Sequence, residues 1–383
     1  MSIEPFLYQK DRRFFAQVAG GMEELGAEEL TELGASATET AYRGVYFVAD
    51  NPALYRIVQE SRLLSRVLAP LVSFDSPDGA TLIKNADAVA WDTFFTVHET
   101  FAIFSQTVDS QIDHSLYAAQ ALKDAIVDQF RKKYYSRPSV DRQNPDVWFN
   151  IYIENDRATV SLDLGGALHK RGYRRKQLEA PMKETLAAAI VRLSEWHGSM
   201  PLWDPFCGSG TLLCEALMHF HRIPAGYLRK NLSLKRLPDF EAEPFQVLQE
   251  GLKEGVRKAT DRVRILGSDA DFRAIAAAKT NLRCLPYGDR VKLKVGDFRD
   301  ADGFENGVII TNPPFGTRLG SIKELTGLYR EFGDFLKNKC KGSTAYIYVG
   351  NRELIPALGL KTSRKIPLFN GALDGRLVKL ELY

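Results

Sequence analysis

Apolar residues along the first 170 positions alternate between strand-like and helix-like spacing. Runs of four to eight residues with period-two alternation are typical of half-buried strands, and longer runs with a period near 3.6 are typical of helices. A turn at residues 154–156 is expected to pair the two runs beside it. Strands are therefore predicted at residues 14–18, 44–48, 101–108, 148–153 and 159–164, and helices at 22–33, 52–67 and 115–130.

The pattern changes after residue 181, where Pro181 stands near the first turn of a clearly amphipathic helix over 183–196. From there apolar strands alternate with helices, which is typical of a doubly wound, largely parallel sheet. We therefore expect an α/β fold of this class, preceded by a mixed α+β region. The strands are predicted at residues 202–203, 263–266, 291–295, 308–310, 345–349 and 377–382.

Composition narrows the class of protein. The chain has 383 residues, of which 45% are hydrophobic and 26% charged, as expected for two or three globular domains. No apolar run approaches the roughly 18 residues of a membrane-spanning helix, and residues 1–15 lack the features of a secretory signal. The four cysteines form no disulfide framework or zinc motif, so we expect a reduced, cytoplasmic protein.

Charge is distributed unevenly along the chain. Residues 1–170 have a net charge of −8 and residues 171–383 one of +11. Two local clusters of cations, one of them interleaved with Tyr173, are either solvated surface and linker or contacts to the phosphates of a nucleic acid. The candidates for RNA binding are Arg131, Lys132, Lys133, Arg137, Lys170, Arg171, Arg174 and Arg175.

A glycine-rich turn lies between an apolar strand and a helix. Such a turn lets backbone N–H groups approach a ligand closely, and the following helix adds positive potential. The segment matches neither the phosphate-binding loop nor the dinucleotide fingerprint, because it lacks their lysine and third glycine. An acid at the end of the strand favours a ligand with a cationic or hydroxyl-rich part. The candidate residues are Asp204, Pro205, Phe206, Gly208, Ser209, Gly210 and Thr211.

A second motif, Asn312-Pro313-Pro314-Phe315, follows another predicted strand. Open α/β sheets bind their ligands at the carboxyl ends of the strands. Asn312 offers a side-chain carbonyl, Pro313 offers a backbone carbonyl without an N–H, and Phe315 offers a flat apolar face. Two acceptors beside a stacking surface suit a planar base with an exocyclic amine.

Two further acids are predicted at strand ends. Asp269 follows the strand at 263–266, and an acid at that position commonly binds ribose hydroxyls; Asp271 is a second candidate for the same role. Asp297, beside Phe298, follows the strand at 291–295 and could bind an adenine amine. Each acid alone is more often a strand-end cap. Together with Asp204 and Asn312 they place polar groups at four strand ends.

Both motifs resemble those of class I S-adenosylmethionine-dependent amino-methyltransferases. The wider chain resembles the THUMP-domain RNA methyltransferases that modify guanine N2 in large-subunit ribosomal RNA, which are often labelled N6-adenine DNA methylases. Nearly the whole chain takes part in this resemblance. The segments that show it outside the two motifs are 14–16, 20–23, 61–67, 123–128, 137–141, 168–174, 180–185, 318–320 and 368–371.

The resemblance implies S-adenosylmethionine as cofactor and assigns roles to residues. Asp204 and Gly208–Gly210 would line the cofactor site, Asp269 would bind its ribose and Asp297 its adenine, and Asn312–Phe315 would hold the target base. Two departures stand out. Phe315 replaces the tyrosine of many relatives, and residues 222–262 form a crossover longer than usual before Asp269.

The expected domains are an N-terminal α/β portion of ferredoxin-like type (1–44), a THUMP domain (45–165), a basic linker (166–180) and the methyltransferase domain (181–383). We expect transfer of a methyl group to the 2-amino group of a guanosine, in 23S rRNA, without a metal ion. The alternatives are a tRNA guanine-N2 methyltransferase, an N6-adenine DNA methyltransferase and a non-catalytic RNA-binding factor. The modified nucleotide and the oligomeric state stay open.

Overall fold

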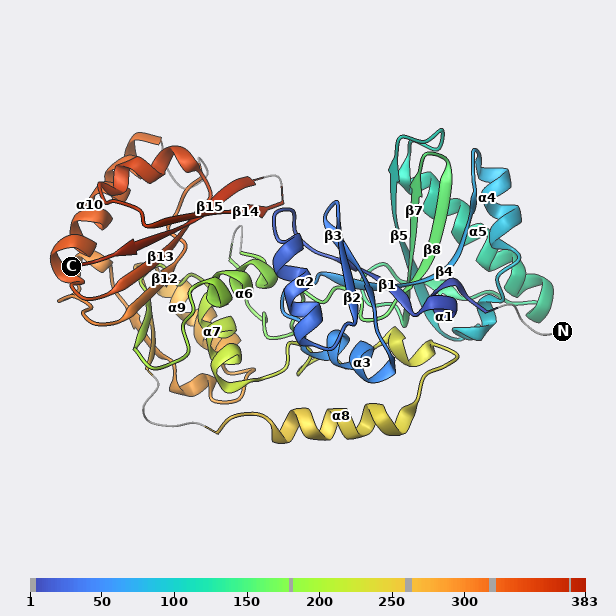
Figure 1. The fold of residues 1–383 in the computed structure, drawn as a ribbon, viewed down its shortest axis with the longest axis horizontal. Coiled ribbons are helices and arrows are strands. Elements are labelled where there is room, and N and C mark those ends of the chain that lie inside the picture. Colours follow the sequence, from blue (N-terminus) through green and yellow to red (C-terminus); the bar gives the residue numbers. More distant parts are fainter. Residues whose placement is uncertain (1–4, 179–181, 259–263, 317–321, 372) are drawn as a thin grey trace. The chain divides into compact units, whose positions relative to one another are not determined.

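The computed structural model describes residues 5–178, 182–258, 264–316, 322–371 and 373–383 (Figure 1). Pro181, Val263 and the segment 318–320, which entered the predictions above, lie outside these ranges. The chain forms two compact units that are interleaved in sequence. Unit 1 comprises residues 1–18, 26–168 and 229–248, and unit 2 comprises residues 19–25, 169–228 and 249–383.

Unit 1 is built on one eight-stranded sheet, with strand order β2-β3-β1-β4-β8-β7-β5-β6. Its pairs are antiparallel except for β5, which runs parallel to both β6 and β7. The strands are β1 (Arg13–Gln17), β2 (Ala37–Ala41), β3 (Gly44–Val48), β4 (Arg66–Asp75), β5 (Thr100–Val108), β6 (Ser139–Val140), β7 (Val147–Glu154) and β8 (Arg157–Asp163).

The ten-residue strand β4 joins the two halves of this sheet. Its first residues pair with β1, and the strand pairs with β8 from Leu68, opposite Asp163, to Asp75, opposite Arg157. Two expectations were wrong here. The helix predicted over 52–67 ends at Glu60, because Leu63 and Leu64 are buried outside it and Val67 is already in β4. A boundary between residues 44 and 45 would cut β3, which pairs with both β1 and β2.

Helices pack against the sheet of unit 1, and buried apolar residues form its core. The core includes Leu54 and Ile57 of α3 and Leu122 and Ile126 of α5. Asp50 caps α3 by accepting a hydrogen bond from the backbone N–H of Ala53, and proline stands in its first turn. The helical elements are α1 (Leu7–Asp11), α2 (Glu23–Glu32), α3 (Asn51–Glu60), α4 (Gly79–Ala86), η1 (Trp91–Thr93) and α5 (Ser115–Tyr134).

Part of the long crossover after the glycine-rich motif belongs to unit 1. Residues 229–248 include η2 (Ser233–Arg236) and the first half of α8 (Ala242–Glu254), and they add Leu232, Leu234 and Phe245 to the unit 1 core. Polar contacts secure the segment. Asp239 accepts hydrogen bonds from the Tyr8 hydroxyl at 2.5 Å and from the Arg12 guanidinium.

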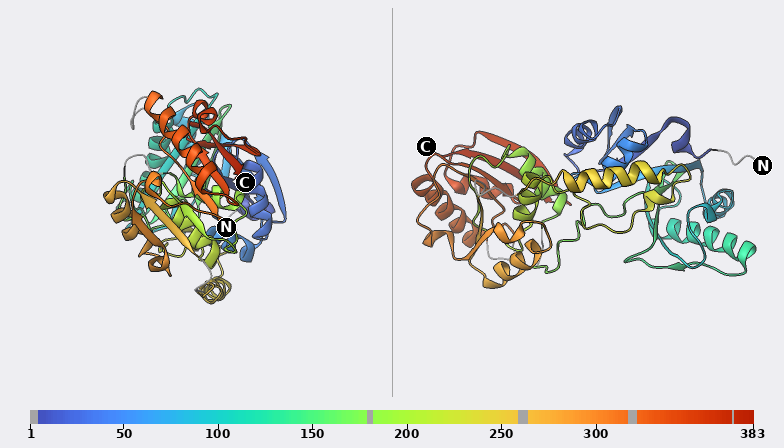
Figure 2. Two further views of the ribbon diagram at one scale, coloured as in Figure 1. Left: turned by 90° about the vertical axis from the view of Figure 1, so that its left-hand side faces the viewer. Right: turned by 90° about the horizontal axis from the view of Figure 1, so that it is seen from below.

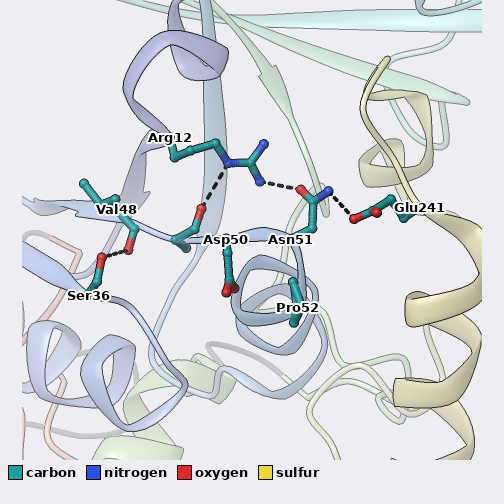
Figure 3. Close-up of a pocket in the computed structure, with 8 residues that line it drawn as sticks. Arg12, Ser36, Val48, Asp50, Asn51, Pro52 and Glu241 are labelled. Atoms are coloured by element: carbon teal, nitrogen blue, oxygen red, sulfur yellow. Dashed lines mark hydrogen bonds between the residues drawn. The ribbon is translucent and has the colours of Figure 1, made fainter.

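Figure 3 shows the neighbouring contacts of this segment, where they border an open hollow. Arg12 donates to the Asn51 side-chain carbonyl, and the Asn51 amide donates to the Glu241 carboxylate at 2.7 Å. Glu241 is also held through its backbone N–H, which donates to the Tyr55 hydroxyl at 2.8 Å. The extra length of the crossover therefore forms part of the fold of unit 1.

Unit 2 contains a seven-stranded sheet with strand order β11-β10-β9-β12-β13-β15-β14. The first five strands are parallel, and β15 and β14 are antiparallel to their neighbours. This is the doubly wound sheet expected from the sequence, with the addition of the unpredicted edge strand β14. The strands are β9 (Leu202–Asp204), β10 (Ile265–Asp269), β11 (Lys292–Val295), β12 (Val308–Thr311), β13 (Thr344–Val349), β14 (Arg364–Asn370) and β15 (Leu373–Glu381).

Two groups of helices pack against this sheet (Figure 1), and Figure 2 gives two further views of them. One group consists of α6, α7 and α9, in which α7 contacts both α6 and α9. The other consists of α10 and η6, whose apolar residues share a core with the short turn η4. Their bounds are α6 (Glu184–Leu193), α7 (Thr211–His221), α9 (Phe272–Leu282), η3 (Gly288–Arg290), η4 (Phe298–Asp300), α10 (Ile322–Lys339) and η6 (Arg352–Leu358).

Residues 19–25 also belong to unit 2, although they lie near the N-terminus. Gly21 has a φ of +77°, and a Cβ at this position would lie 3.0 Å from the ring of Phe369 in β14. Glycine is needed here for both its backbone angle and its close approach. Two segments that showed the family resemblance, 20–23 and 368–371, therefore meet in space.

Candidate active site

The glycine-rich motif occupies the turn between β9 and α7. Asp204, the last residue of β9, is buried, and its Oδ1 accepts hydrogen bonds from the Phe206 N–H at 3.1 Å and the Thr311 hydroxyl at 2.6 Å. Its Oδ2 is buried and has no hydrogen-bond partner in the described part of the chain. Burial raises the pKa of Asp204 to about 7. An unpartnered carboxylate oxygen of this kind suits a cationic ligand.

The two glycines of the turn have backbone angles that favour glycine, with φ of +51° at Gly208 and +82° at Gly210. The two glycines differ in the space available for a side chain. A Cβ on Gly210 would lie 3.0 Å from Ala278 of α9, whereas one on Gly208 would meet nothing within 4 Å. Gly210 therefore permits close packing, and Gly208 leaves open space for a ligand. Cys207, directly before Gly208, is buried, and burial raises the pKa of its thiol well above the usual value, which disfavours a thiolate nucleophile.

Asp269 ends β10 and braces the glycine-rich turn. Its two carboxylate oxygens accept hydrogen bonds from the backbone N–H groups of Gly208 and Asp271, each at 2.9 Å. The carboxylate of Asp271 instead caps α9 and pairs with Arg273 at 2.9 Å. Both acids line the same pocket. The Asp271 carboxylate is the one already engaged by a cation.

Asp297 and Phe298 follow β11 and also line the pocket. Asp297 caps the short turn η4 through the Arg299 N–H and forms an ion pair with the Arg299 guanidinium at 2.8 Å. The ring of Phe298 packs among other aromatic rings, with centroid distances of 5.3 Å to Phe206 and 5.1 Å to Phe332. This cluster gives the pocket a rigid aromatic wall.

The second motif follows β12. The Asn312 side-chain carbonyl oxygen is buried and has no hydrogen-bond partner among the described residues. The Phe315 ring lies against Gly350, where a Cβ would come within 2.3 Å of it, and its edge faces Tyr348 at a centroid distance of 6.3 Å. The Thr311 hydroxyl bonded to Asp204 connects this motif directly to the first.

These segments surround one cavity of about 1380 Å³ at the carboxyl edge of the sheet. Its volume exceeds the roughly 300–1,000 Å³ of ordinary small-molecule sites, so it has room for a cofactor and a nucleobase together. All predicted cofactor and catalytic residues line it except Gly210. S-adenosylmethionine fits this cavity. Its ammonium and sulfonium groups are cationic and suit the carboxylates that line it, and the space at Gly208 is open.

Several lining residues were not predicted from the sequence. Those far from the predicted motifs and strand-end acids are Leu178, Met182, Leu328, Gly350, Asn351, Arg352, Leu373 and Asp374. Asn351 and Arg352 follow β13, so a search for polar residues after predicted strands would have identified them. Asp374 lies at the beginning of β15, and only the antiparallel pairing of β15 with β13 brings it to this edge.

The basic segment 169–176 is packed within unit 2 and does not form a free linker. Arg171 is 1% exposed and pairs with Glu215 of α7 at 3.3 Å, and the Tyr173 hydroxyl donates to the same carboxylate. Arg174 pairs with Glu184 at 3.0 Å. The burial of Arg171 contradicts the prediction that it contacts RNA, whereas the RNA contact of Arg174, whose side chain is 13% exposed, stays a prediction.

The other predicted RNA-binding cations are exposed. Three of them, at the end of α5, form surface ion pairs: Arg131 with Asp128, Lys132 with Asp87 and Lys133 with Asp92. Surface pairs of this kind contribute little to stability and exchange readily. Arg137, Lys170 and Arg175 are exposed as well.

Neither a membrane helix nor a metal cluster occurs in the described ranges. No helix there is long and apolar enough to cross a bilayer. No three His, Cys, Asp or Glu side chains in those ranges are arranged to hold a metal ion.

Three family descriptions match the chain in sequence. They are the RlmL ferredoxin-like domain over residues 13–68, the THUMP domain over residues 80–163, and the RMKL-like methyltransferase domain over residues 171–379. The first two matches include strands of the eight-stranded sheet of unit 1, and the first also includes residues 19–25 of unit 2. The third contains the whole pocket-lining set.

Individual proteins are similar over nearly the full chain. "Putative RNA methyltransferase slr0064" of Synechocystis sp. is 38% identical over 97% of both chains. "Ribosomal RNA large subunit methyltransferase K/L" of Aliivibrio salmonicida is 37% identical over 94% of this chain, but the chain spans about half (52%) of that protein's length. The solved structure of "SMU.472, a putative methyltransferase complexed with SAH" has a TM-score of 0.82 at 26% identity and covers 97% of this chain and 98% of its own.

The matches agree with the geometry of the pocket. The domain match covers more than half of the chain, and the structural neighbour was crystallised with the demethylated form of the expected cofactor. The resemblance noted in the sequence is thereby confirmed, as is the fold class. This chain belongs to the RMKL-like methyltransferase family, with a ferredoxin-like and a THUMP domain before the methyltransferase domain, and its cofactor is S-adenosylmethionine.

Proposed function

We propose that this protein methylates the exocyclic 2-amino group of a guanosine in large-subunit ribosomal RNA, in the cytoplasm. The observation that supports it best is the buried, unpartnered carbonyl oxygen of Asn312 beside the Phe315 ring. A buried acceptor without a donor is costly, so a ligand N–H is expected to complete it. The THUMP match and the names of the two relatives support RNA as the substrate.

The catalytic task follows from the chemistry of the amine. Its lone pair is delocalised into the ring, which makes it a poor nucleophile. The carbonyl oxygens of Asn312 and Pro313 accept hydrogen bonds from its two N–H groups, which localises the lone pair on the nitrogen and directs it toward the methyl group, while Phe315 stacks on the base. S-adenosylmethionine supplies the electrophilic methyl group. Positioning and fixed dipoles are the contributions of the protein, and no metal ion is required.

The pocket residues divide between cofactor and base. We assign Asp204 and the turn at Gly208 to the methionine part of the cofactor, because the free oxygen of Asp204 and the open space meet there. We assign its ribose to Asp269 rather than Asp271, whose carboxylate pairs with Arg273. We assign its adenine to Asp297 beside the wall formed by Phe298. RNA contacts are assigned to Arg131, Lys132, Lys133, Arg137, Lys170 and Arg175.

Mass mapping of modified nucleosides tests the proposal. Ribosomal RNA and tRNA from a deletion strain are compared with those from the same strain expressing either the wild-type protein or Asn312→Ala. One guanosine of large-subunit rRNA should lose its N2-methyl group in the deletion and regain it only with the wild-type protein. Loss of the mark from tRNA, or of N6-methyladenine from DNA, would favour an alternative substrate instead.

A further inference from the structure

The pocket extends beyond the residues that serve the cofactor. In the order of the sheet, Asp204, Asp269 and Asp297 follow β9, β10 and β11 on one side of β12, whereas β13 and β15 lie on its other side. The motif Asn312–Phe315 follows β12 and therefore stands between the two halves. The target base must extend from Asn312 into the half formed by β13 and β15, since the other half is assigned to the cofactor.

Two charged side chains line that second half: Arg352, three residues after β13, and Asp374 in β15. Register places them together, because Val349 at the end of β13 pairs with Arg376 of β15. Arg352 Nη1 lies 3.6 Å from Asp374 Oδ2. β15 is two strands from β12, about 10 Å at ordinary sheet spacing, which leaves room for a base between Asn312 and Asp374.

Asp374 is an ionised acceptor held in a fixed orientation. The Arg376 guanidinium contacts both of its carboxylate oxygens, one of them at 3.2 Å. Hydrogen bonds from Arg376 lower the pKa of Asp374, so the carboxylate offers acceptor lone pairs and no donor. Its side chain remains 41% exposed and can contact a ligand. Arg352 is 69% exposed and offers donors only.

Guanine, adenine and cytosine each have an exocyclic amine, but they differ in the ring atom next to it. In guanine the amine at C2 is followed along the Watson–Crick edge by the N1–H donor and the O6 acceptor. In adenine the amine at C6 is followed by N1, an acceptor, and in cytosine the amine at C4 is followed by N3, also an acceptor. Only guanine presents donor, donor and acceptor in this order, which complements acceptors at Asn312 and Asp374 followed by a donor at Arg352.

We propose that Asp374 selects guanine by accepting a hydrogen bond from its N1–H while Arg352 donates to O6. The inference rests on the proposed function and names the residues that would set its base specificity. With adenine or cytosine in the same orientation, a ring nitrogen lone pair would face the Asp374 carboxylate, so that both acceptors would be unpaired and repel each other. Asn312–Phe315 alone would hold any exocyclic amine.

The test compares two bases that have the same 2-amino group. Once mass mapping has located the methylated guanosine, synthetic RNA fragments are made with guanosine or 2,6-diaminopurine at that position. The latter keeps the amine, but its N1 is an acceptor. We expect the wild-type enzyme to prefer guanosine strongly. Asp374→Asn should reduce this preference roughly tenfold or more, because an amide can donate to the diaminopurine N1 and still accept from guanine.

Controls separate recognition from structural effects. Asp374→Glu retains a carboxylate and should keep the wild-type preference even if its rate falls. Glu381→Gln removes a carboxylate from the far end of β15 and should change neither rate nor preference. Calorimetry should show unchanged cofactor affinity in all three variants. An Asp374→Asn enzyme that loses activity equally on both bases would overturn the inference while leaving guanine methylation intact. Methylation of adenine N6 by the wild-type enzyme would overturn the inference together with the proposed function.

Discussion

Two buried oxygen atoms of the pocket, Asp204 Oδ2 and Asn312 Oδ1, have no hydrogen-bond partner among the described residues. Native proteins rarely leave such groups unpaired, so each is expected to meet a ligand. The Thr311 hydroxyl, which donates to the other oxygen of Asp204, couples their positions. One oxygen is assigned to the cofactor and the other to the base, so substitutions at the two residues should have different effects.

Asn312→Ala should abolish methyl transfer while leaving cofactor binding largely intact. The side-chain carbonyl orients the target amine, and removing one oriented interaction of this kind typically costs on the order of a hundredfold in rate. Tritiated methyl transfer to unmodified rRNA measures the rate, and calorimetry measures cofactor affinity. Phe315→Tyr is the control, since it keeps the stacking ring and should remain active. Near wild-type turnover by Asn312→Ala would exclude the base-holding role.

The pH dependence of cofactor affinity should depend on Asp204. Burial raises its pKa to about 7, so the empty site is protonated below that pH and ionised above it. A cationic ligand favours the ionised form, so affinity should rise between pH 6 and 7 and level off above pH 7. Calorimetry in buffers of different ionisation enthalpy should detect proton release at pH 6. The Asp204→Asn variant should bind the cofactor weakly and with little pH dependence. If its affinity rises with pH as steeply as that of the wild type, another group causes the effect.

The same shift predicts the sign of a stability effect. Because the pKa of the folded state lies above that of the unfolded chain, the unfolded state releases its proton first as the pH rises. The contribution of Asp204 to folding is therefore present below about pH 4 and is lost as the pH approaches 7. Asp204→Asn should weaken the fall in stability over this window, as measured by denaturant unfolding.

At the scale of elements, the ends of strands and the packing of their loops determine the site. The edge of the parallel sheet gathers the residues after β9 to β13, and β15 adds Asp374 from the opposite direction. Close contacts keep these loops in position, such as Gly350 against the ring of Phe315. In unit 1 the segment 229–248 has a comparable structural role, because it completes an apolar core.

Gly350→Ala should impair catalysis without impairing cofactor binding. Its Cβ would come within 2.3 Å of the Phe315 ring, so the ring must shift from the position where it stacks on the base. We expect a clear loss of methyl-transfer rate. Gly327→Ala is the control, because Gly327 is also in unit 2, has no positive φ, and a Cβ there would meet nothing within 4 Å. Equal rates for wild type and Gly350→Ala would show that the position of the ring is not critical.

Asp239→Ala should destabilise unit 1 by about 1–3 kcal/mol, because it leaves buried Tyr8 and partly buried Arg12 without their shared acceptor. Thermal unfolding, with limited proteolysis to locate the weakened region, measures the effect. Cofactor affinity should not change, since the pocket lies entirely in unit 2. Glu243→Ala, an exposed acid on α8, is the matched control. Unaltered stability of Asp239→Ala would mean that the apolar contacts of 229–248 suffice.

At the scale of the whole molecule, the THUMP domain and the pocket lie in different units, whereas the exposed cations expected to bind RNA lie in both. Of the cations expected to contact RNA, Arg171 and Arg174 form ion pairs with Glu215 and Glu184, and the others are exposed. Substrate affinity should therefore depend on exposed cations of both units.

Neutralising Arg137, Lys170 and Arg175 to glutamine should weaken RNA binding and make it less sensitive to salt. Removing the cation that pairs with one phosphate should reduce the slope of log affinity against log salt by roughly 0.7–0.9. Filter binding across a salt series measures both quantities, and cofactor affinity should not change. A control triple variant neutralises Lys323, Lys337 and Lys339 of α10. Identical salt slopes for the test variant and the wild type would show that these cations do not bind RNA phosphates.

Local patterns in the sequence were sufficient for most of the strands and for the predicted residues of the pocket. β3 has the predicted bounds, and Asp204, Asp269, Asp297 and Asn312 all line one cavity. This succeeded because a parallel sheet brings the residues that follow its strands to one edge, whatever the distance between them in sequence. Glycine-rich turns and a proline pair are likewise local signals.

Tertiary structure decided what depends on partners distant in sequence. The positive charge of Arg171 suggested a surface role, but Glu215, 44 residues away, holds it in the interior. Leu63, Leu64 and Val67 fit a helical period, but the sheet requires a strand from Arg66 onward. Asp374 reaches the pocket only through antiparallel pairing with β13. In each case local periodicity or charge is compatible with two environments, and the long-range contacts select one of them.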